Sequence, residues 1–177
     1  MVKKTLIFFG LSIAFILIFA FFLPKKNLLY FIQKELYPSH IVFDFKQVSE
    51  SGYSLKLQES ILYFEGVDVF TCKRSEIRTY LLYNTIFLKN IVLSDLAKEF
   101  IPLKVDNLKI IYGIHSPLQL SFNGNGDFGT VKGYVDLVQK KLFLILYPSV
   151  KMKNKYHKTL RYLHKNKQGE LSYEYNY

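Results

Sequence analysis

The chain has one cysteine and no tryptophan among its 177 residues. A single thiol excludes an internal disulfide, so a disulfide-stapled scaffold is excluded as well. Cys72 lies in a stretch typical of a strand, and we interpret it as a packed side chain rather than a reactive one. Only five prolines and nine glycines are present, and no run of them resembles a flexible linker. We therefore expect one domain of ordinary size.

Residues that carry catalysis or bind metals are scarce and dispersed. The four histidines (His40, His115, His157 and His164) do not pair with a cysteine or a carboxylate at the spacing of a metal site. No arrangement of a nucleophile with a neighbouring base is recognisable. The sequence therefore predicts a non-enzymatic protein without a metal or cofactor.

One glycine motif resembles a phosphate-binding loop. Residues 124–131 read Gly-Asn-Gly-Asp-Phe-Gly-Thr-Val, which satisfies the pattern G-x-G-x-x-G. A dinucleotide site needs those glycines to open a helix whose N-terminus holds the pyrophosphate. The residues that follow, 131–137, have the pattern of a strand. We therefore exclude phosphate binding at this motif and predict a hairpin turn at residues 123–126, which read Asn-Gly-Asn-Gly.

Positive charge is concentrated at two places. The net charge is +10, from 24 basic and 14 acidic residues. Lys3, Lys4, Lys25 and Lys26 flank an apolar run, and seven cations lie within residues 149–167, which contain no carboxylate side chain. The remaining residues have a net charge of −1. This balance disfavours a generally basic nucleic-acid-binding domain.

The apolar run begins at Thr5 and ends at Leu23, without a charged residue between them. Its 19 residues would form a helix of about 28 Å, close to the roughly 30 Å hydrocarbon core of a bilayer. The run ends in bulky residues, which favours a retained helix over a cleaved signal peptide. We predict a transmembrane anchor over residues 1–26, in contact with membrane lipids. Its short N-terminus favours a cytoplasmic start, with the rest of the chain periplasmic or extracytoplasmic at the inner (plasma) membrane.

After the anchor the apolar periodicity changes twice. Residues 27–40 carry apolar side chains at helical spacing until Pro38, which predicts a helical connector. In residues 41–177, short runs of apolar residues alternate with polar ones, and turn signals separate the runs. We expect one mainly β extracytoplasmic domain built on an antiparallel sheet, with one short helix over residues 94–100. Clear alternation occurs at residues 53–57, 67–69, 86–88 and 118–122.

Residues 149–167 predict a basic amphipathic helix. Ser149 is a suitable N-cap, and Tyr156, Leu160 and Leu163 recur at helical spacing. Such a helix can bind anionic lipid or an acidic partner subunit, can bind nucleic-acid phosphates, or can be solvated while its apolar stripe packs on the sheet. The sequence leaves these interpretations open. The cations of the segment are Lys151, Lys153, Lys155, Lys158, Arg161, Lys165 and Lys167.

The order of motifs in the C-terminal half resembles a known family. Residues 126–137 read GDFGTVKGYVDL, and an apolar strand ending in YPS at residues 147–149 precedes the basic segment and a short last strand. Residues 53–64 (YSLKLQESILYF) and 86–95 (IFLKNIVLSD) have a similar pattern of apolar and polar residues. This arrangement resembles the N subunit of type II secretion systems, whose periplasmic domain is akin to those of AsmA-type lipid-transport proteins. The resemblance implies a curved antiparallel sheet, open or closed to a half-barrel, and no catalytic residues.

Three functions follow as hypotheses. The first is a bitopic inner-membrane component of a type II secretion or pilus-like machine, which docks other envelope subunits in the periplasm. The second is an AsmA-like lipid-binding or lipid-transport protein whose concave sheet face shelters acyl chains. The third, which the charge balance disfavours, is a membrane-tethered DNA-uptake factor that uses the basic helix. For the second we expect an apolar groove lined by Leu118, Leu120, Phe122, Leu142, Leu144 and Leu146.

Overall fold

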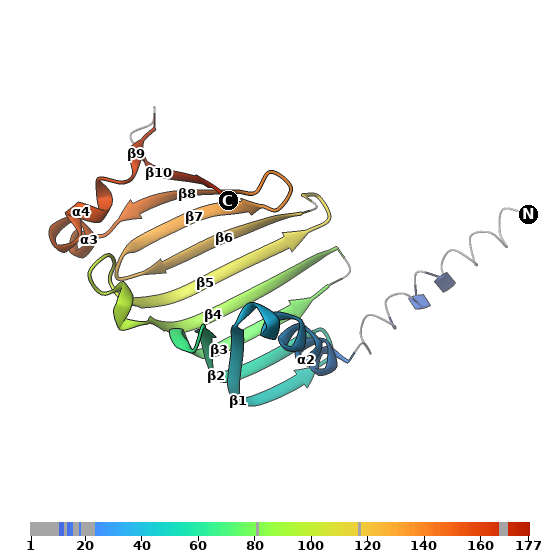
Figure 1. Cartoon of the computed structure of the whole chain (residues 1–177). Helices are drawn as coiled ribbons and strands as arrows, with labels where there is room; N and C mark the ends of the chain where they lie inside the picture. The colour runs from blue at the N-terminus through green and yellow to red at the C-terminus, as the bar shows by residue number, and fades with distance from the viewer. Residues whose placement is uncertain are drawn as a thin grey trace, which may run out of the picture.

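The computed structural model consists of one curved antiparallel sheet with short helices (Figure 1), which confirms the expectation of a mainly β fold. It describes residues 11, 12, 14, 15, 18, 24–80, 82–116, 118–166 and 170–177. The helices are α2 (Lys25–Leu36), η1 (Tyr37–Ser39), η2 (Asp95–Ala97), α3 (Val150–Lys155) and α4 (His157–Leu160). The strands are β1 (Ile41–Ser51), β2 (Ser54–Phe64), β3 (Val67–Thr79), β4 (Tyr83–Leu93), β5 (Lys104–Gly113), β6 (Gln119–Gly126), β7 (Gly129–Asp136), β8 (Lys141–Pro148), β9 (His164–Lys165) and β10 (Leu171–Asn176).

From β1 to β8 the sheet is a meander in which each strand pairs with the next one in sequence, whereas β8 pairs with β10, which also pairs with β9. Its order is β1 to β8, then β10 and β9. Tight turns make this order possible, as at Glu65 and Gly66 between β2 and β3, where φ is +52° and +80°. Positive φ at both turn residues matches the twist of the flanking strands, so successive strands pair side by side.

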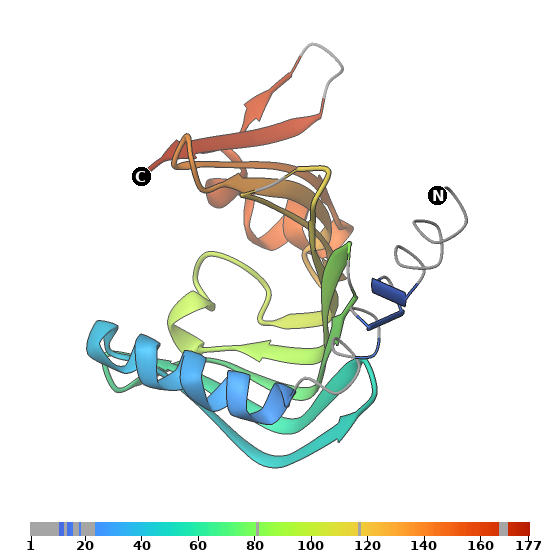
Figure 2. The same ribbon diagram turned by 90° about the vertical axis from the view of Figure 1, so that its right-hand side faces the viewer.

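One face of the sheet is apolar and concave, and α2 packs against it. Leu29 of α2 forms a buried cluster with Leu55 and Leu57 of β2. Phe43 and Phe45 of β1 pack against the same cluster. Figure 2 shows the sheet curling around α2, so the face that carries these side chains is the inner face of the curve. We call it the concave face and the opposite one the outer face.

A line of bends crosses β1 to β5 and explains the curvature. The alternation of side chains is interrupted once in each strand, where two consecutive polar residues replace the expected polar–apolar pair. The ladder is interrupted at the same level, since Gln58 pairs with Arg74 and Ser60 with Cys72, while Glu59 adopts a φ of +48°. Two successive side chains on the outer face lengthen that face and bend the strand toward the other one. The polar pairs are Lys46–Gln47, Gln58–Glu59, Lys73–Arg74, Lys89–Asn90 and Asp106–Asn107.

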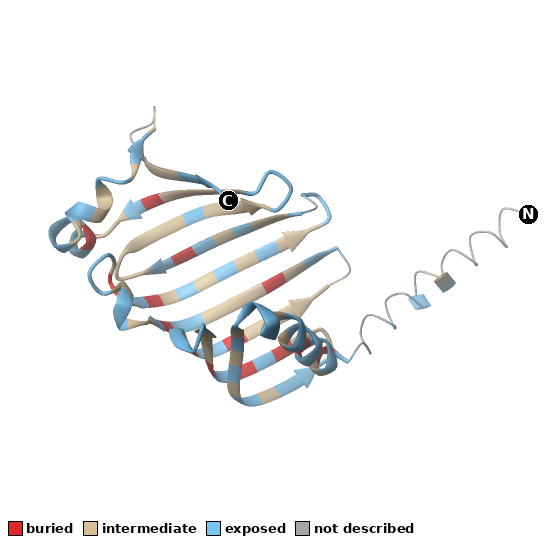
Figure 3. Cartoon of the chain, in the orientation of Figure 1, coloured by how far each residue is buried: buried red, intermediate tan, exposed pale blue. Residues whose placement is uncertain are grey.

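The buried core is small and lies mainly at the β1–β5 end of the sheet (Figure 3). Its second cluster contains Cys72, Ile91 and Val105. Cys72 is buried, and its sulfur lies 3.5 Å from the hydroxyl oxygen of Ser75, which lies 3.0 Å from that of Ser60. The thiol is therefore packed and hydrogen-bonded within the sheet.

The fold prediction is corrected on the transmembrane helix. Within the part of the chain that the structure describes, no helix is long and apolar enough to cross a membrane. α2 has 12 residues, enough for only about 18 Å, and it contains four charged side chains. The predicted span of residues 5–23 lies outside the described residues apart from Leu11, Ser12, Ala14, Phe15 and Ile18.

The prediction of one basic C-terminal helix is wrong. Ser149 does cap a helix, by accepting a hydrogen bond from the backbone N–H of Met152, but α3 ends at Lys155. Tyr156 leaves helical geometry, with a φ of −118° and a ψ of +30°, and a second short helix, α4, follows. The expected helix at residues 94–100 is a single 3-10 turn, with Ser94 as its N-cap.

The hairpin beside the glycine motif is displaced from its predicted place. β6 continues through the Asn-Gly-Asn-Gly segment, and the turn lies at Asp127 and Phe128, between the paired Gly126 and Gly129. A Cβ on Gly126 would lie 2.5 Å from the carbonyl oxygen of Lys104. The glycine therefore permits close strand packing here rather than forming the turn.

A carboxylate from β1 holds the N-terminus of α2. Pro24 supplies no side-chain cap, and Glu50 instead accepts hydrogen bonds from the backbone N–H groups of Lys25 (2.8 Å) and Lys26 (3.4 Å). Further along the helix, the side-chain amide of Gln33 donates to the carbonyl oxygen of Phe43. The first bond satisfies a free N–H group and places a negative charge at the positive end of the helix dipole.

We expect Glu50→Gln to lower the free energy of unfolding by about 1 kcal/mol at pH 7, because the helix loses a charged cap. The backbone N–H of Lys25 is the main reason why the pKa of Glu50 lies below its ordinary value of 4.5. A pKa that is lower in the folded state stabilises the fold above the unfolded pKa and ceases to do so as pH falls through the folded value.

The free energies of unfolding of the wild-type and variant chains in urea should therefore differ at pH 7 and converge as the pH falls through the folded pKa of Glu50. Glu65→Gln, in the β2–β3 turn, is the matched control and should not show this convergence. A difference between Glu50→Gln and the wild type that persists at low pH would contradict the assignment.

Candidate functional site

The concave face carries an unbroken apolar row across the sheet. In β2, β3, β4 and β5 the paired residues of this row are Leu55, Ile77, Ile86 and Ile110. The row continues through Phe122 of β6, Gly133 of β7, Leu144 of β8 and Tyr173 of β10. Because paired residues point to the same side of a sheet, the face that binds α2 extends over eight strands.

Five of the six predicted groove residues lie on this face. Leu120 and Phe122 pair with Val135 and Gly133 of β7, and Leu142 and Leu144 pair with the same two residues from the other side. Leu146 belongs to the same set of alternate positions in β8. Leu118 is not brought into it, because it precedes β6 with a φ of +69° and is 49% exposed.

The β5–β8 part of the concave face is only half covered. Leu108, Ile110, Phe122 and Leu144 are all half-buried, whereas Leu55 and Leu57 beneath α2 are 2% and 1% exposed. A sheet normally buries its apolar face against a second layer. Each Å² of apolar surface left in water forgoes about 25 cal/mol, so this face can bind an apolar ligand favourably.

Gly133 shapes the floor of this region. A Cβ at this position would lie 2.6 Å from the ring carbon Cζ of Phe122 and 2.2 Å from the carbonyl oxygen of Phe143. The missing side chain therefore lets the Phe122 ring lie over β7.

The described cations of the basic segment lie on several elements rather than on one helix. Lys151 forms an ion pair with Asp127 and holds the pKa of that carboxyl below its ordinary value. Thr159 of α4 donates a hydrogen bond of 2.6 Å to the carbonyl oxygen of Phe100. Lys165 lies on β9, at the far edge of the sheet, and Lys167 lies outside the described residues. Lys153, Lys155, Lys158 and Arg161 are exposed on α3, on α4 and just after it.

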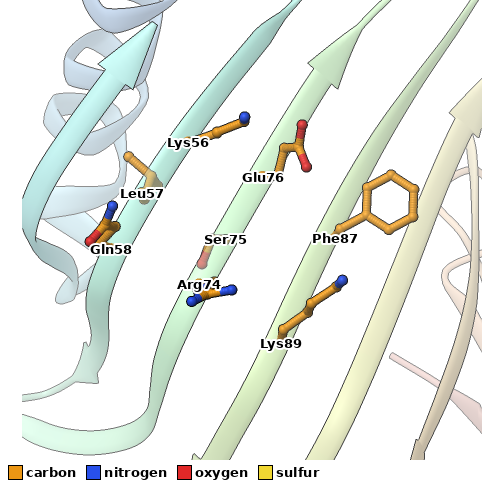
Figure 4. Close-up of a pocket in the computed structure, with 8 residues that line it drawn as sticks. All are labelled: Lys56, Leu57, Gln58, Arg74, Ser75, Glu76, Phe87 and Lys89. Atoms are coloured by element: carbon orange, nitrogen blue, oxygen red, sulfur yellow. The ribbon is translucent and has the colours of Figure 1, made fainter.

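The outer face holds a polar pocket that the sequence interpretation missed. Its volume is about 320 Å³. It is lined by Lys56, Leu57 and Gln58 of β2, Arg74, Ser75 and Glu76 of β3, and Phe87 and Lys89 of β4. Figure 4 shows Lys56, Glu76, Phe87 and Lys89 projecting from one side of the strands. The signal in the sequence was the pair of polar residues that interrupts the alternation of each strand.

Charge in this pocket is unbalanced. Glu76 is engaged by Arg78, whose Nε and Nη2 donate to its two carboxylate oxygens at 2.9 and 3.1 Å. This pairing is the main reason why the pKa of Glu76 lies below its ordinary value. Within the residues that the structure describes, Lys56, Arg74 and Lys89 form no ion pair.

We expect Gly133→Ala to destabilise the fold by about 1–3 kcal/mol, because the added methyl group overpacks the floor beneath Phe122. Gly113→Ala is the control, since its Cβ would meet only Tyr83 Cβ at 3.6 Å and the Leu82 carbonyl oxygen at 3.7 Å. The measurement is the urea midpoint of each variant. Equal urea midpoints for the two variants would show that the position of the Phe122 ring over β7 does not depend on the missing side chain at Gly133.

Comparison with known proteins adds no relative. No family model matches the chain, and neither a curated protein nor a solved structure matches it.

Proposed function

We propose that the chain is a non-enzymatic lipid-binding protein that shelters acyl chains against the concave face of its sheet. This is the AsmA-like hypothesis drawn from the sequence. The observation that supports it is the apolar row from Leu55 to Tyr173, covered by α2 at one end and half-buried over β5–β8.

The chemistry of the row suits hydrocarbon better than a peptide. It contains only Leu, Ile, Phe, Gly and Tyr, none of them charged. A peptide needs hydrogen-bond partners for its backbone, whereas burial of each methylene of an acyl chain contributes about 0.8 kcal/mol without any polar partner. An eight-residue strand such as β8 offers a length of about 26 Å in one direction.

Lipid binding can be tested with two neighbouring residues of β8. Leu144 pairs with Gly133 and Tyr173 on the concave face, whereas Ile145 pairs with Lys132 and Ser172 on the outer face. We expect Leu144→Gln to weaken binding of a fluorescent fatty acid about tenfold, equivalent to ~1.4 kcal/mol, because it places an amide among apolar side chains. Ile145→Gln should leave the affinity within about twofold of the wild type.

The result is interpretable because both variants make the same chemical change in the same strand. Urea midpoints of the two variants identify any loss that comes from unfolding alone. Equal affinities for folded Leu144→Gln and Ile145→Gln, or no saturable binding by the wild type, would refute the proposal.

Docking of an envelope subunit, as in a secretion machine, is the second candidate. β1 lies at the edge of the sheet and pairs with β2, and no other described strand pairs with it. An edge strand of 11 residues offers backbone N–H and C=O groups to a strand of another subunit. Mass spectrometry after mild-detergent extraction separates the candidates: co-purified lipid supports the first, and co-purified subunits without lipid support the second.

A further inference from the structure

The outer-face pocket contains an arrangement that costs stability in the free protein. Arg74 of β3 and Lys89 of β4 are directly paired residues of adjacent antiparallel strands. Like charges at such positions lie about 5 Å apart at Cβ and destabilise the sheet. Lys56 pairs directly with Glu76 of β3 and is diagonal to Arg74, because Gln58, two residues further along β2, is the partner of Arg74. Three cations therefore converge on one opening.

Glu76 is the one carboxylate among the lining residues. It interacts with the charges of Lys56 and Lys89, but a single negative charge does not balance three cations. Both oxygens of Glu76 accept hydrogen bonds from Arg78, so its charge is already matched by a fourth cation. The Phe87 ring forms another wall of the pocket. Its centroid lies 5.0 Å from Arg78 Cζ and 5.3 Å from Lys109 Nζ. Cations on both sides strengthen the positive potential of the pocket.

We propose that this pocket binds a phosphate group, carried by a small ester or by a lipid headgroup. A phosphate offers up to two negative charges and three terminal oxygens, which match two lysines and a guanidinium able to donate two parallel hydrogen bonds. The side-chain amide of Gln58 adds a neutral donor, and the Phe87 ring offers an apolar wall for the organic part of the ligand. The site lies on the face opposite to the proposed lipid-binding surface, and so does not depend on that function.

The first test titrates the full chain, in mild detergent, with inorganic pyrophosphate by isothermal titration calorimetry. We expect saturable binding that Arg74→Gln and Lys89→Gln each weaken at least tenfold. Lys132→Gln is the matched control, since it removes one charge from the outer face at β7, away from the pocket. Its affinity should stay within about twofold of the wild type. An equal loss in Lys132→Gln and Arg74→Gln, or no saturable binding, would overturn the proposal.

Folding and binding are separated by two further measurements. Because Arg74→Gln and Lys89→Gln relieve a like-charge pair, the melting temperature of each should equal or exceed that of the wild type. Arg74→Lys keeps the charge and removes the two-pronged donor, so its affinity should fall between those of the wild type and Arg74→Gln. Wild-type affinity in a folded Arg74→Gln variant would refute a role for the guanidinium.

The source of the phosphate is distinguished by competition. Glycerol 3-phosphate represents a soluble ester, and micelles doped with phosphatidic acid represent a lipid headgroup, with phosphatidylcholine micelles as the control. Displacement of pyrophosphate by glycerol 3-phosphate alone assigns a soluble ester. Displacement by phosphatidic acid, and not by phosphatidylcholine, assigns a lipid headgroup. If none of them displaces pyrophosphate, the site does not bind phosphate esters and the proposal is wrong.

Discussion

The interruption of side-chain alternation at one level of five neighbouring strands determines the form of this protein. A regular strand sends alternate residues to opposite faces, but β1 to β5 each send two consecutive polar residues outward, as Gln58–Glu59 and Lys89–Asn90 do. The longer outer face forces a bend, and register aligns the bends across the sheet. The resulting curve (Figure 2) gives the apolar side chains a common inner face on which α2 packs.

The bend also explains what could and could not be predicted from the sequence. Alternation in segments such as Leu55-Lys56-Leu57 was enough to predict an antiparallel mainly β domain, because periodicity of two is a local property. The aligned interruptions have meaning only once the register is known, since Glu59 and Asn90 are 31 positions apart in sequence and two strands apart in the sheet. Predicting the face shared by Leu120, Phe122, Leu142, Leu144 and Leu146 required only their alternation.

Errors of the sequence interpretation arose where local propensity competed with contacts made elsewhere. The stripe of Tyr156, Leu160 and Leu163 predicted one helix. Instead, helical geometry is interrupted at Tyr156, and Thr159 donates a hydrogen bond to the carbonyl oxygen of Phe100. The glycines of residues 124–129 predicted a turn at the first pair, whereas Gly126 is needed for close approach to Lys104. In the same way, the capping of α2 by Glu50, 25 residues from Lys25, leaves no signal near the helix.

The same constraint connects the two surfaces that we assign to ligands. At the line of bends each of the strands β1 to β5 contributes two outward side chains instead of one. The outer face therefore has a higher density of polar groups, and the second polar side chain of each pair does not point to the inner face. Arg74 and Lys89, which line the cationic pocket, are members of these pairs. Their mutual repulsion opposes folding locally. Apolar residues next to the pairs, such as Leu57 and Leu88, contribute to the concave face. A substitution that restored regular alternation in one strand without removing a residue would therefore affect both faces, since it would turn apolar side chains outward and polar ones inward along the rest of that strand.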